Sequence, residues 1–157
     1  MAYIDIITLA EAKNYLRIDD TLTDDDAQIT RMINAALAYV ENCTNIMLFA
    51  RNKTYTMVDG FVRVYDYPIN IATPPVPADV EVEIKTSYVN YSYGYETCDL
   101  VLNVGFASAA DVPAQLKEVA FEIIDLMYYE HETGKKYTKD LTTLSTVILN
   151  SYRRFIL

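Results

Sequence analysis

A run of carboxylates within eight residues is the part of this chain that could do chemistry. Asp19, Asp20, Asp24, Asp25 and Asp26 lie between two stretches with helical periodicity. Carboxylates at two-residue steps are the ligands of a calcium loop of the EF-hand type, which also needs a Gly at its sixth position and a Glu at its twelfth. Neither residue stands there, whether the count starts at Asp20 or at Asp24. We therefore interpret the aspartates as solvated carboxylates beside a helix start and predict no metal site.

Patterns typical of catalysis are missing elsewhere in the sequence. His131 is the only histidine, and its neighbours Glu130 and Glu132 do not complete the H-E-x-x-H motif of zinc proteases. The four glycines match no phosphate-binding loop. Cys43 and Cys98 lie too far apart for a C-x-x-C site, so we expect two reduced thiols. We predict no enzyme and no cofactor; the rival hypothesis is an enzyme that holds a divalent metal on the aspartates.

Four tyrosines follow one another closely in the middle of the chain. Alternation along a strand places the last three on one face. They could pack within the sheet, contact another protein, since tyrosine gives a large contact area at low entropic cost, or stack the bases of a single strand. The last mode needs a basic groove, which the mainly acidic flanks do not offer. We predict an interface and keep a small protein- or single-strand-binding module as the alternative; the residues are Tyr88, Tyr91, Tyr93 and Tyr95.

The C-terminus places two arginines beside three apolar residues. The segment is a candidate for the last helical turn packing back on the protein, or for an arm that docks in a neighbouring protein. We favour the arm, which comprises Tyr152, Arg153, Arg154, Phe155, Ile156 and Leu157.

Length and charge bound the function further. A chain of 157 residues is about one domain, so we expect a single domain over 1–157. The net charge of −9 argues against a high-affinity nucleic-acid binder. The first 45 residues are acidic and the last stretch is basic, which favours head-to-tail contacts between copies that can close into a ring. We find no signal peptide, and no apolar run approaches the roughly 20 residues of a membrane span.

Helical signals occur at both ends of the chain. Thr8 and Glu11 form a capping box that starts a helix over about 8–18. Apolar residues at three- and four-residue spacing predict further helices over about 24–44, 112–133 and 141–155. We expect the last helix to bury Leu144, Val147, Ile148 and Tyr152.

The region between these helices, about 51–107, has strand signals. Asp59-Gly60 predicts a two-residue hairpin turn between strands over 53–58 and 61–67. Residues 80–84 alternate valine or isoleucine with glutamate, which predicts a strand with one wet face. The fold class is therefore α+β: mainly an α-helical bundle, with two N-terminal and two C-terminal helices, and a central β-hairpin or sheet insertion.

The sequence resembles the head–tail connector, or adaptor, proteins of tailed bacteriophages. Residues 9–19 are similar to the family's opening L-x-E-A-K-x-x-L-R-v-D, and residues 24–44 are similar to its D-D-x-x-I-x-x-l-I-x-a-A-x-x-y-v-E-x-x-T. Residues 112–117 follow a strand and match the family's V-P-x-x-l-k. Asn45 stands where the family usually has Gly.

This resemblance implies a structural virion protein of the neck, made in the host cytoplasm. Its relatives form a ring, commonly of twelve copies, beneath the portal protein, and provide a platform for the next neck or tail protein. DNA passes through the channel without sequence-specific binding. We expect residues 152–157 to dock in the portal, the tyrosines to contact a neighbouring subunit or the next ring, and the aspartates of residues 19–26 to face the channel or ring surface.

Overall fold

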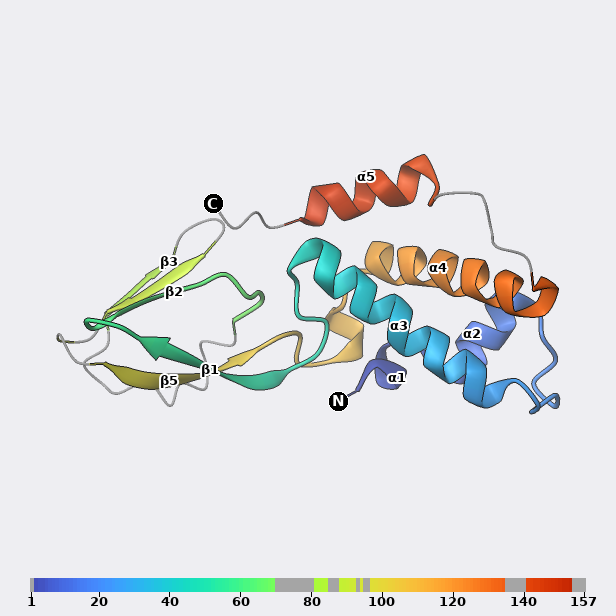
Figure 1. Ribbon diagram of the computed structural model, residues 1–157, viewed down its shortest axis with the longest axis horizontal. Helices are drawn as coiled ribbons and strands as arrows, with labels where there is room; N and C mark the ends of the chain where they lie inside the picture. The colour runs from blue at the N-terminus through green and yellow to red at the C-terminus, as the bar shows by residue number, and fades with distance from the viewer. Residues whose placement is uncertain are drawn as a thin grey trace.

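A computed structural model describes residues 2–69, 81–84, 88–92, 94, 97–134 and 141–153. The molecule is elongated, with a bundle of helices at one end and two small β-sheets at the other (Figure 1). The predicted α+β class is confirmed, since helices from both ends of the chain form the bundle and the middle of the chain forms the strands. None of the described helices combines the length and the hydrophobicity that a membrane span requires.

Three helices come from the first 45 residues: α1 (Tyr3–Ile6), α2 (Leu9–Leu16) and α3 (Asp26–Thr44). The capping box of α2 is confirmed, because the Thr8 hydroxyl accepts from the Glu11 N–H and the Glu11 carboxylate accepts from the Thr8 N–H. Asn45 ends α3 in the left-handed conformation, which asparagine tolerates in place of glycine. The short α1 is not predicted by the sequence analysis.

Two helices come from the end of the chain. A 3₁₀ turn (Ala109–Asp111) leads into α4 (Ala114–Thr133), and α5 (Thr143–Tyr152) follows. The expected buried face of α5 is partly wrong: Leu144 is 69% exposed and Val147 is 57% exposed, whereas Ser145 and Leu149 are buried. Because α5 carries apolar residues on more than one face, periodicity alone did not single out the side that packs.

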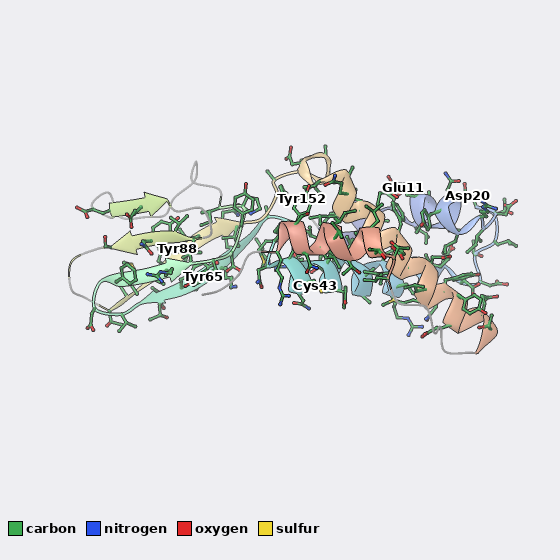
Figure 2. All side chains as sticks on the ribbon, turned by 90° about the horizontal axis from the view of Figure 1, so that it is seen from above. Glu11, Asp20, Cys43, Tyr65, Tyr88 and Tyr152 are labelled. Carbon is green, nitrogen blue, oxygen red and sulfur yellow. The ribbon has the colours of Figure 1, made fainter. Side chains whose placement is uncertain are left out.

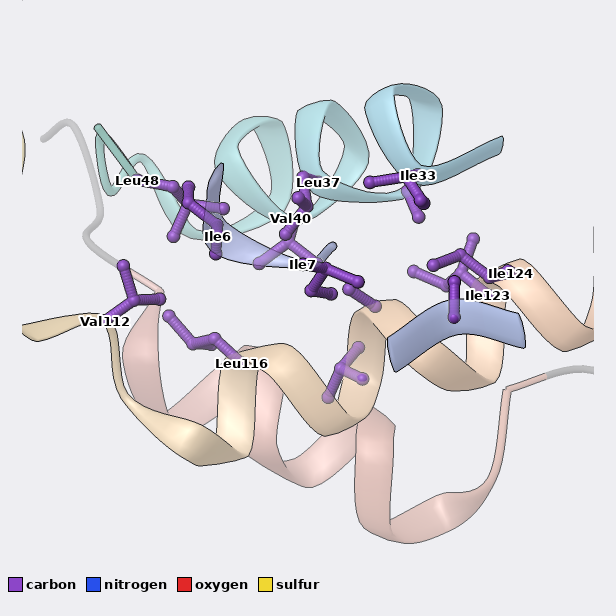
Figure 3. Packing of buried hydrophobic residues seen from close by; sticks show 14 of the residues in the cluster. Ile6, Ile7, Ile33, Leu37, Val40, Leu48, Val112, Leu116, Ile123 and Ile124 are labelled. Carbon is purple, nitrogen blue, oxygen red and sulfur yellow. The ribbon is translucent and has the colours of Figure 1, made fainter. Parts of the chain in front are cut away.

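The core of the bundle lies between α3 and α4. Figure 3 shows Ile6 and Ile7, from the α1 region, inserted between Leu37 and Val40 of α3 on one side and Leu116 of α4 on the other. All five side chains are almost completely buried. The early turn α1 therefore belongs to the core of the bundle.

The strands form two sheets rather than one meander. Strands β1 (Arg51–Met57) and β5 (Cys98–Val104) pair antiparallel, and β2 (Phe61–Val64), β4 (Val89–Ser92) and β3 (Glu81–Ile84) form a second sheet in the order β2-β4-β3. The turn at Asp59-Gly60 is confirmed, with both residues at positive φ and two hydrogen bonds between Val58 and Phe61. The hairpin does not continue beyond this turn, because β1 takes β5 as its partner and β2 takes β4.

The two sheets share a second hydrophobic cluster, separate from that of the bundle. It contains Met57 of β1, Leu100 of β5 and Tyr91 of β4, all almost fully buried. The sequence pattern predicts that Val82 lies on the buried face of a strand over 80–84. This prediction is wrong, because Val82 is 42% exposed on β3, the edge strand of its sheet. Residue 80 lies outside the described residues.

A buried carboxylate joins the bundle to the sheets. Glu41 of α3 accepts hydrogen bonds from the Tyr3 hydroxyl of α1, from the backbone N–H of Leu48 and from the Arg51 guanidinium of β1, at 2.5, 2.6 and 3.1 Å. Burial of the phenol, together with the neighbouring carboxylate, raises the pKa of Tyr3 to about 12. Two helices of the bundle and the first strand of the sheets therefore meet on one side chain.

Candidate assembly surfaces

The aspartates predicted from the sequence lie in a loop, residues 19–26, at the end of the bundle away from the sheets (Figure 2, near Asp20). This acidic loop is organised by Lys13, a buried side chain of α2. Its ammonium group donates to the backbone oxygens of Asp20 and Leu22, at 3.0 and 2.5 Å, and to the Asp26 carboxylate at 2.9 Å. Sequence reasoning missed the role of Lys13. The available signal was the position of this lysine among the apolar residues of α2, directly after Ala12.

The five aspartates are not equivalent. Asp26 is paired with Lys13, and Asp25 accepts a hydrogen bond from Tyr128 of α4 at 3.2 Å. Asp19 accepts from the hydroxyl and the backbone N–H of Thr21, and these bonds hold the pKa of the Asp19 carboxyl below its usual value. Exposed negative charge at this end therefore comes chiefly from Asp19, Asp20 and Asp24.

The acidic loop meets the end of α4. Oxygen or nitrogen atoms of Asp25, His131 and Glu132 lie within 4.8 Å of one another, a grouping that could hold a metal ion. This grouping could not be predicted from the sequence, because Asp25 and His131 are far apart in the chain. His131 and Glu132 are exposed and Asp25 is already bound by Tyr128, so this group is a loose surface cluster.

The tyrosines are divided between the two faces of the β2-β4-β3 sheet. Tyr91 is only 2% exposed and packs inside the sheet cluster, so the sheet-packing alternative describes it and its ring is not available to a partner. Tyr88 lies on the other face, the outer sheet face, where the Arg63 guanidinium stands 4.4 Å from the centre of its ring and Tyr65 packs edge-on (Figure 2). Tyr93 and Tyr95 lie outside the described residues.

The outer sheet face also carries Phe61, which is 44% exposed. Arg63 is its only cation among the described residues of the three strands, and it donates to Asn90, which in turn donates to Glu83. This acidic and aromatic surface does not form the basic groove that a single-strand binder needs.

Two residues of the predicted C-terminal arm, Tyr152 and Arg153, lie within the described residues. Tyr152 is half-buried, and its hydroxyl donates to the Gln115 side chain of α4 at 2.9 Å. Arg153 follows as the exposed cap of α5. The rest of the predicted docking arm, Arg154, Phe155, Ile156 and Leu157, lies outside the described residues.

A further surface was not predicted from the sequence. A groove of about 350 Å³ lies where α2, α4 and α5 meet, and we call it the bundle groove. Its walls are apolar at Tyr15, Leu144 and Ile148 and acidic at Glu118 and Asp125. The sequence could not reveal this surface, because it depends on how α5 is rotated against α4.

Comparison with known proteins identifies the family. The family model described as phage gp6-like head-tail connector protein matches residues 6–156, almost the whole chain. The chain belongs to this family. The resemblance seen in the sequence is therefore confirmed, and the protein is a structural head–tail connector. No curated protein matches the chain by sequence.

The fold of this connector is also found in solved structures. A chain in the neck of an empty gene transfer agent particle, computed with sixfold symmetry, has a TM-score of 0.76 and 15% identity, over 97% of this connector and 91% of that chain. A chain in the neck of the native particle, computed with twelvefold symmetry, has a TM-score of 0.67 and 14% identity over the same shares. A chain in the native virion has a TM-score of 0.71 and 15% identity, over 100% of this connector and 94% of that chain. At these identities the similarity shows a shared fold.

Proposed function

We propose that this connector is one subunit of a ring of twelve copies in the virion neck, which sits beneath the portal protein and extends the DNA channel. The observation that carries the proposal is the family match over residues 6–156. The shared fold with chains of a neck that has sixfold or twelvefold symmetry supports the ring. A ring subunit acts by shape and self-association, so we propose no enzymatic activity.

The acidic loop suits a surface that DNA passes. Exposed carboxylates repel the phosphate backbone, so a genome can slide past them without binding. Asp19, Asp20 and Asp24 carry the exposed negative charge, with Asp25 and Asp26 beside them. We propose that this loop faces the channel or the adjoining ring surface.

We propose that residues 152–157 dock in the portal protein. The described part supports a separate role for the last residues: Tyr152 is held on the bundle by Gln115, and Arg153 ends α5 exposed. Two arginines and three apolar side chains follow one another from Arg153 onward, which suits insertion into a groove of a partner.

The outer sheet face is proposed as the contact for the next neck or tail protein or for a neighbouring subunit. Phe61, Arg63 and Tyr88 stand together there, and exposed aromatic and arginine side chains are typical of protein interfaces. Tyr91 takes no part in this contact because it is buried.

Removing the last four residues tests the docking role. Deleting residues 154–157 leaves Tyr152 and its bond to Gln115 in place, so the bundle is expected to fold as before. The expected result is filled heads that lack both the connector and tails, seen by electron microscopy of particles made in the producing host. Ser151→Ala, at an exposed position of α5, is the matched control and should give normal particles. Normal attachment of tails to particles with the shortened chain would show that the docking assignment is wrong.

A reconstruction of the assembled particle tests the whole proposal. The connector should appear as a closed ring between portal and tail, with residues 19–26 on the channel or ring surface. Density for this chain anywhere else in the particle would overturn the neck assignment.

A further inference from the structure

We propose that Arg31 of one subunit contacts the bundle groove of the next subunit in the ring, where Glu118 and Asp125 receive it. The inference rests on the ring proposed above and names the surfaces that meet in it. The partner is a second copy of this chain.

The bundle groove has the chemistry of an unfilled binding surface. Leu144 is 69% exposed and Tyr15 is 44% exposed, although Tyr15 is stacked on Phe121. Glu118 and Asp125 are exposed, and within the described part of the chain they make no hydrogen bond or ion pair. A partner that fits this groove therefore carries a positive charge that can reach the two carboxylates, beside small or apolar side chains.

Arg31 provides such a cation on the outer side of α3. The buried positions of this helix include Ile29, Ile33 and Val40, and successive residues turn by about 100°, which places Arg31 directly opposite the buried face. Its side chain contacts Gln28 of the same helix, and among the described residues it has no carboxylate partner. Ala35 is one turn further along on the same exposed side, so a neighbouring subunit can approach closely.

The two surfaces lie on opposite sides of the subunit. Figure 2 shows α2, which carries Glu11, on one edge of the bundle and α3 on the other, and Figure 1 shows the same arrangement with α3 in front of α2. The groove belongs to the α2 side and Arg31 to the α3 side. Complementary surfaces on opposite sides give a heterologous contact, which is the kind that closes into a ring.

The net charge of the subunit increases the importance of this contact. Each copy carries −9, so copies placed side by side repel one another. An arginine between two otherwise unpaired carboxylates offsets this repulsion locally and fixes which surfaces meet.

Charge reversal on each side tests the contact. Arg31→Glu alone, and Glu118→Arg with Asp125→Arg together, should each reduce ring formation at least about tenfold, because like charges would then face each other. A 1:1 mixture of the two variants should restore rings, because each altered surface then meets its complement when the two variants alternate. Such alternation closes only rings with an even number of subunits, which twelve satisfies.

Arg17→Glu is the matched control, since Arg17 is an exposed cation at the end of α2, on the groove side, and should leave assembly unchanged. Mass photometry of the purified full chain measures ring formation in solution. Counting connector copies in purified particles detects a ring that forms only on the portal. Circular dichroism checks that each variant is folded.

The outcomes separate this inference from the proposed function. Normal rings from Arg31→Glu, or a mixture that fails to rescue assembly, would overturn the Arg31 contact and leave the ring itself in place. A wild-type chain that forms no ring in solution or on particles would overturn the proposed function and this contact together.

Discussion

At the scale of single residues, the acidic loop depends on one buried ammonium group. Lys13 neutralises part of the loop and satisfies two backbone oxygens that would otherwise lack a donor. Buried polar groups are expensive when unpaired, so this lysine does more for the loop than an exposed ion pair would. The loop between α2 and α3 is therefore fixed from within, while its outer carboxylates remain free to face solvent or DNA.

We expect Lys13→Met to destabilise the protein by about 2–3 kcal/mol, because methionine fills similar space but leaves Asp20, Leu22 and Asp26 without their donor. Urea unfolding followed by circular dichroism measures the change. Lys117→Met, at a half-buried lysine of α4 with no hydrogen bond among the described residues, should cost less than about 0.5 kcal/mol. Equal losses from both variants would contradict the role given to Lys13.

At the scale of the elements, the sequence predicted what local chemistry determines. The capping box at Thr8 and the turn at Asp59-Gly60 each depend on a few adjacent residues, and both are present. Helix α1 was missed because four residues carry too little periodicity to detect.

Features that depend on contacts between distant elements could not be predicted. Tertiary packing decides the exposure of Leu144, the burial of Tyr91 and the pairing of β1 with β5.

The candidate surfaces likewise divide into one that local sequence predicts and others that depend on packing. The acidic loop was visible in the sequence, whereas the bundle groove and the place of Arg31 opposite it required the packed helices.

One glycine is required where the sheets meet the bundle. Gly105 has φ +107°, and a Cβ atom there would lie 2.1 Å from the carbonyl oxygen of Phe49. We expect Gly105→Ala to cost roughly 3 kcal/mol, because both the backbone angle and the backbone contact oppose it. Gly134→Ala, where φ is +60° and nothing lies within 4 Å, should cost only about 1 kcal/mol. Thermal unfolding of both variants compares them, and a smaller loss at Gly105 would contradict the close approach.

At the scale of the whole molecule, the helical bundle and the sheets have separate hydrophobic clusters. The position of one relative to the other must stay fixed if every subunit of a ring is to present the same surface to its neighbour. Glu41 supplies this link by binding Tyr3, Leu48 and Arg51 at the junction. Burial of the Tyr3 phenol and its hydrogen bond to the Glu41 carboxylate both favour the neutral form in the folded state. The link should therefore weaken in alkali.

The sign of the pH effect follows from the direction of that shift. The folded pKa of Tyr3 is about 12, above the ordinary value of 10.0, so the stabilisation is complete below pH 10 and is lost as the pH rises to about 12. Tyr3→Phe should cost about 1 kcal/mol at pH 7, and its difference from wild type should shrink as the pH passes 10. Urea unfolding at several pH values measures this difference, with Tyr129→Phe, at an exposed position of α4, as control. A difference that stays constant up to pH 12 would count against the Tyr3–Glu41 bond.

The start of α5 is held by a side chain from another helix. Glu122 of α4 accepts from the backbone N–H and the hydroxyl of Thr142 and from the hydroxyl of Ser145. A helix of ten residues is too short to persist alone in water, so α5 depends on a carboxylate that arrives only when α4 is in place. A copy whose bundle has not matured would thus fail to display an ordered α5 to its surroundings. Because Leu144 and Ile148 of α5 line the bundle groove, such a copy would lack the surface proposed to receive Arg31 of its neighbour.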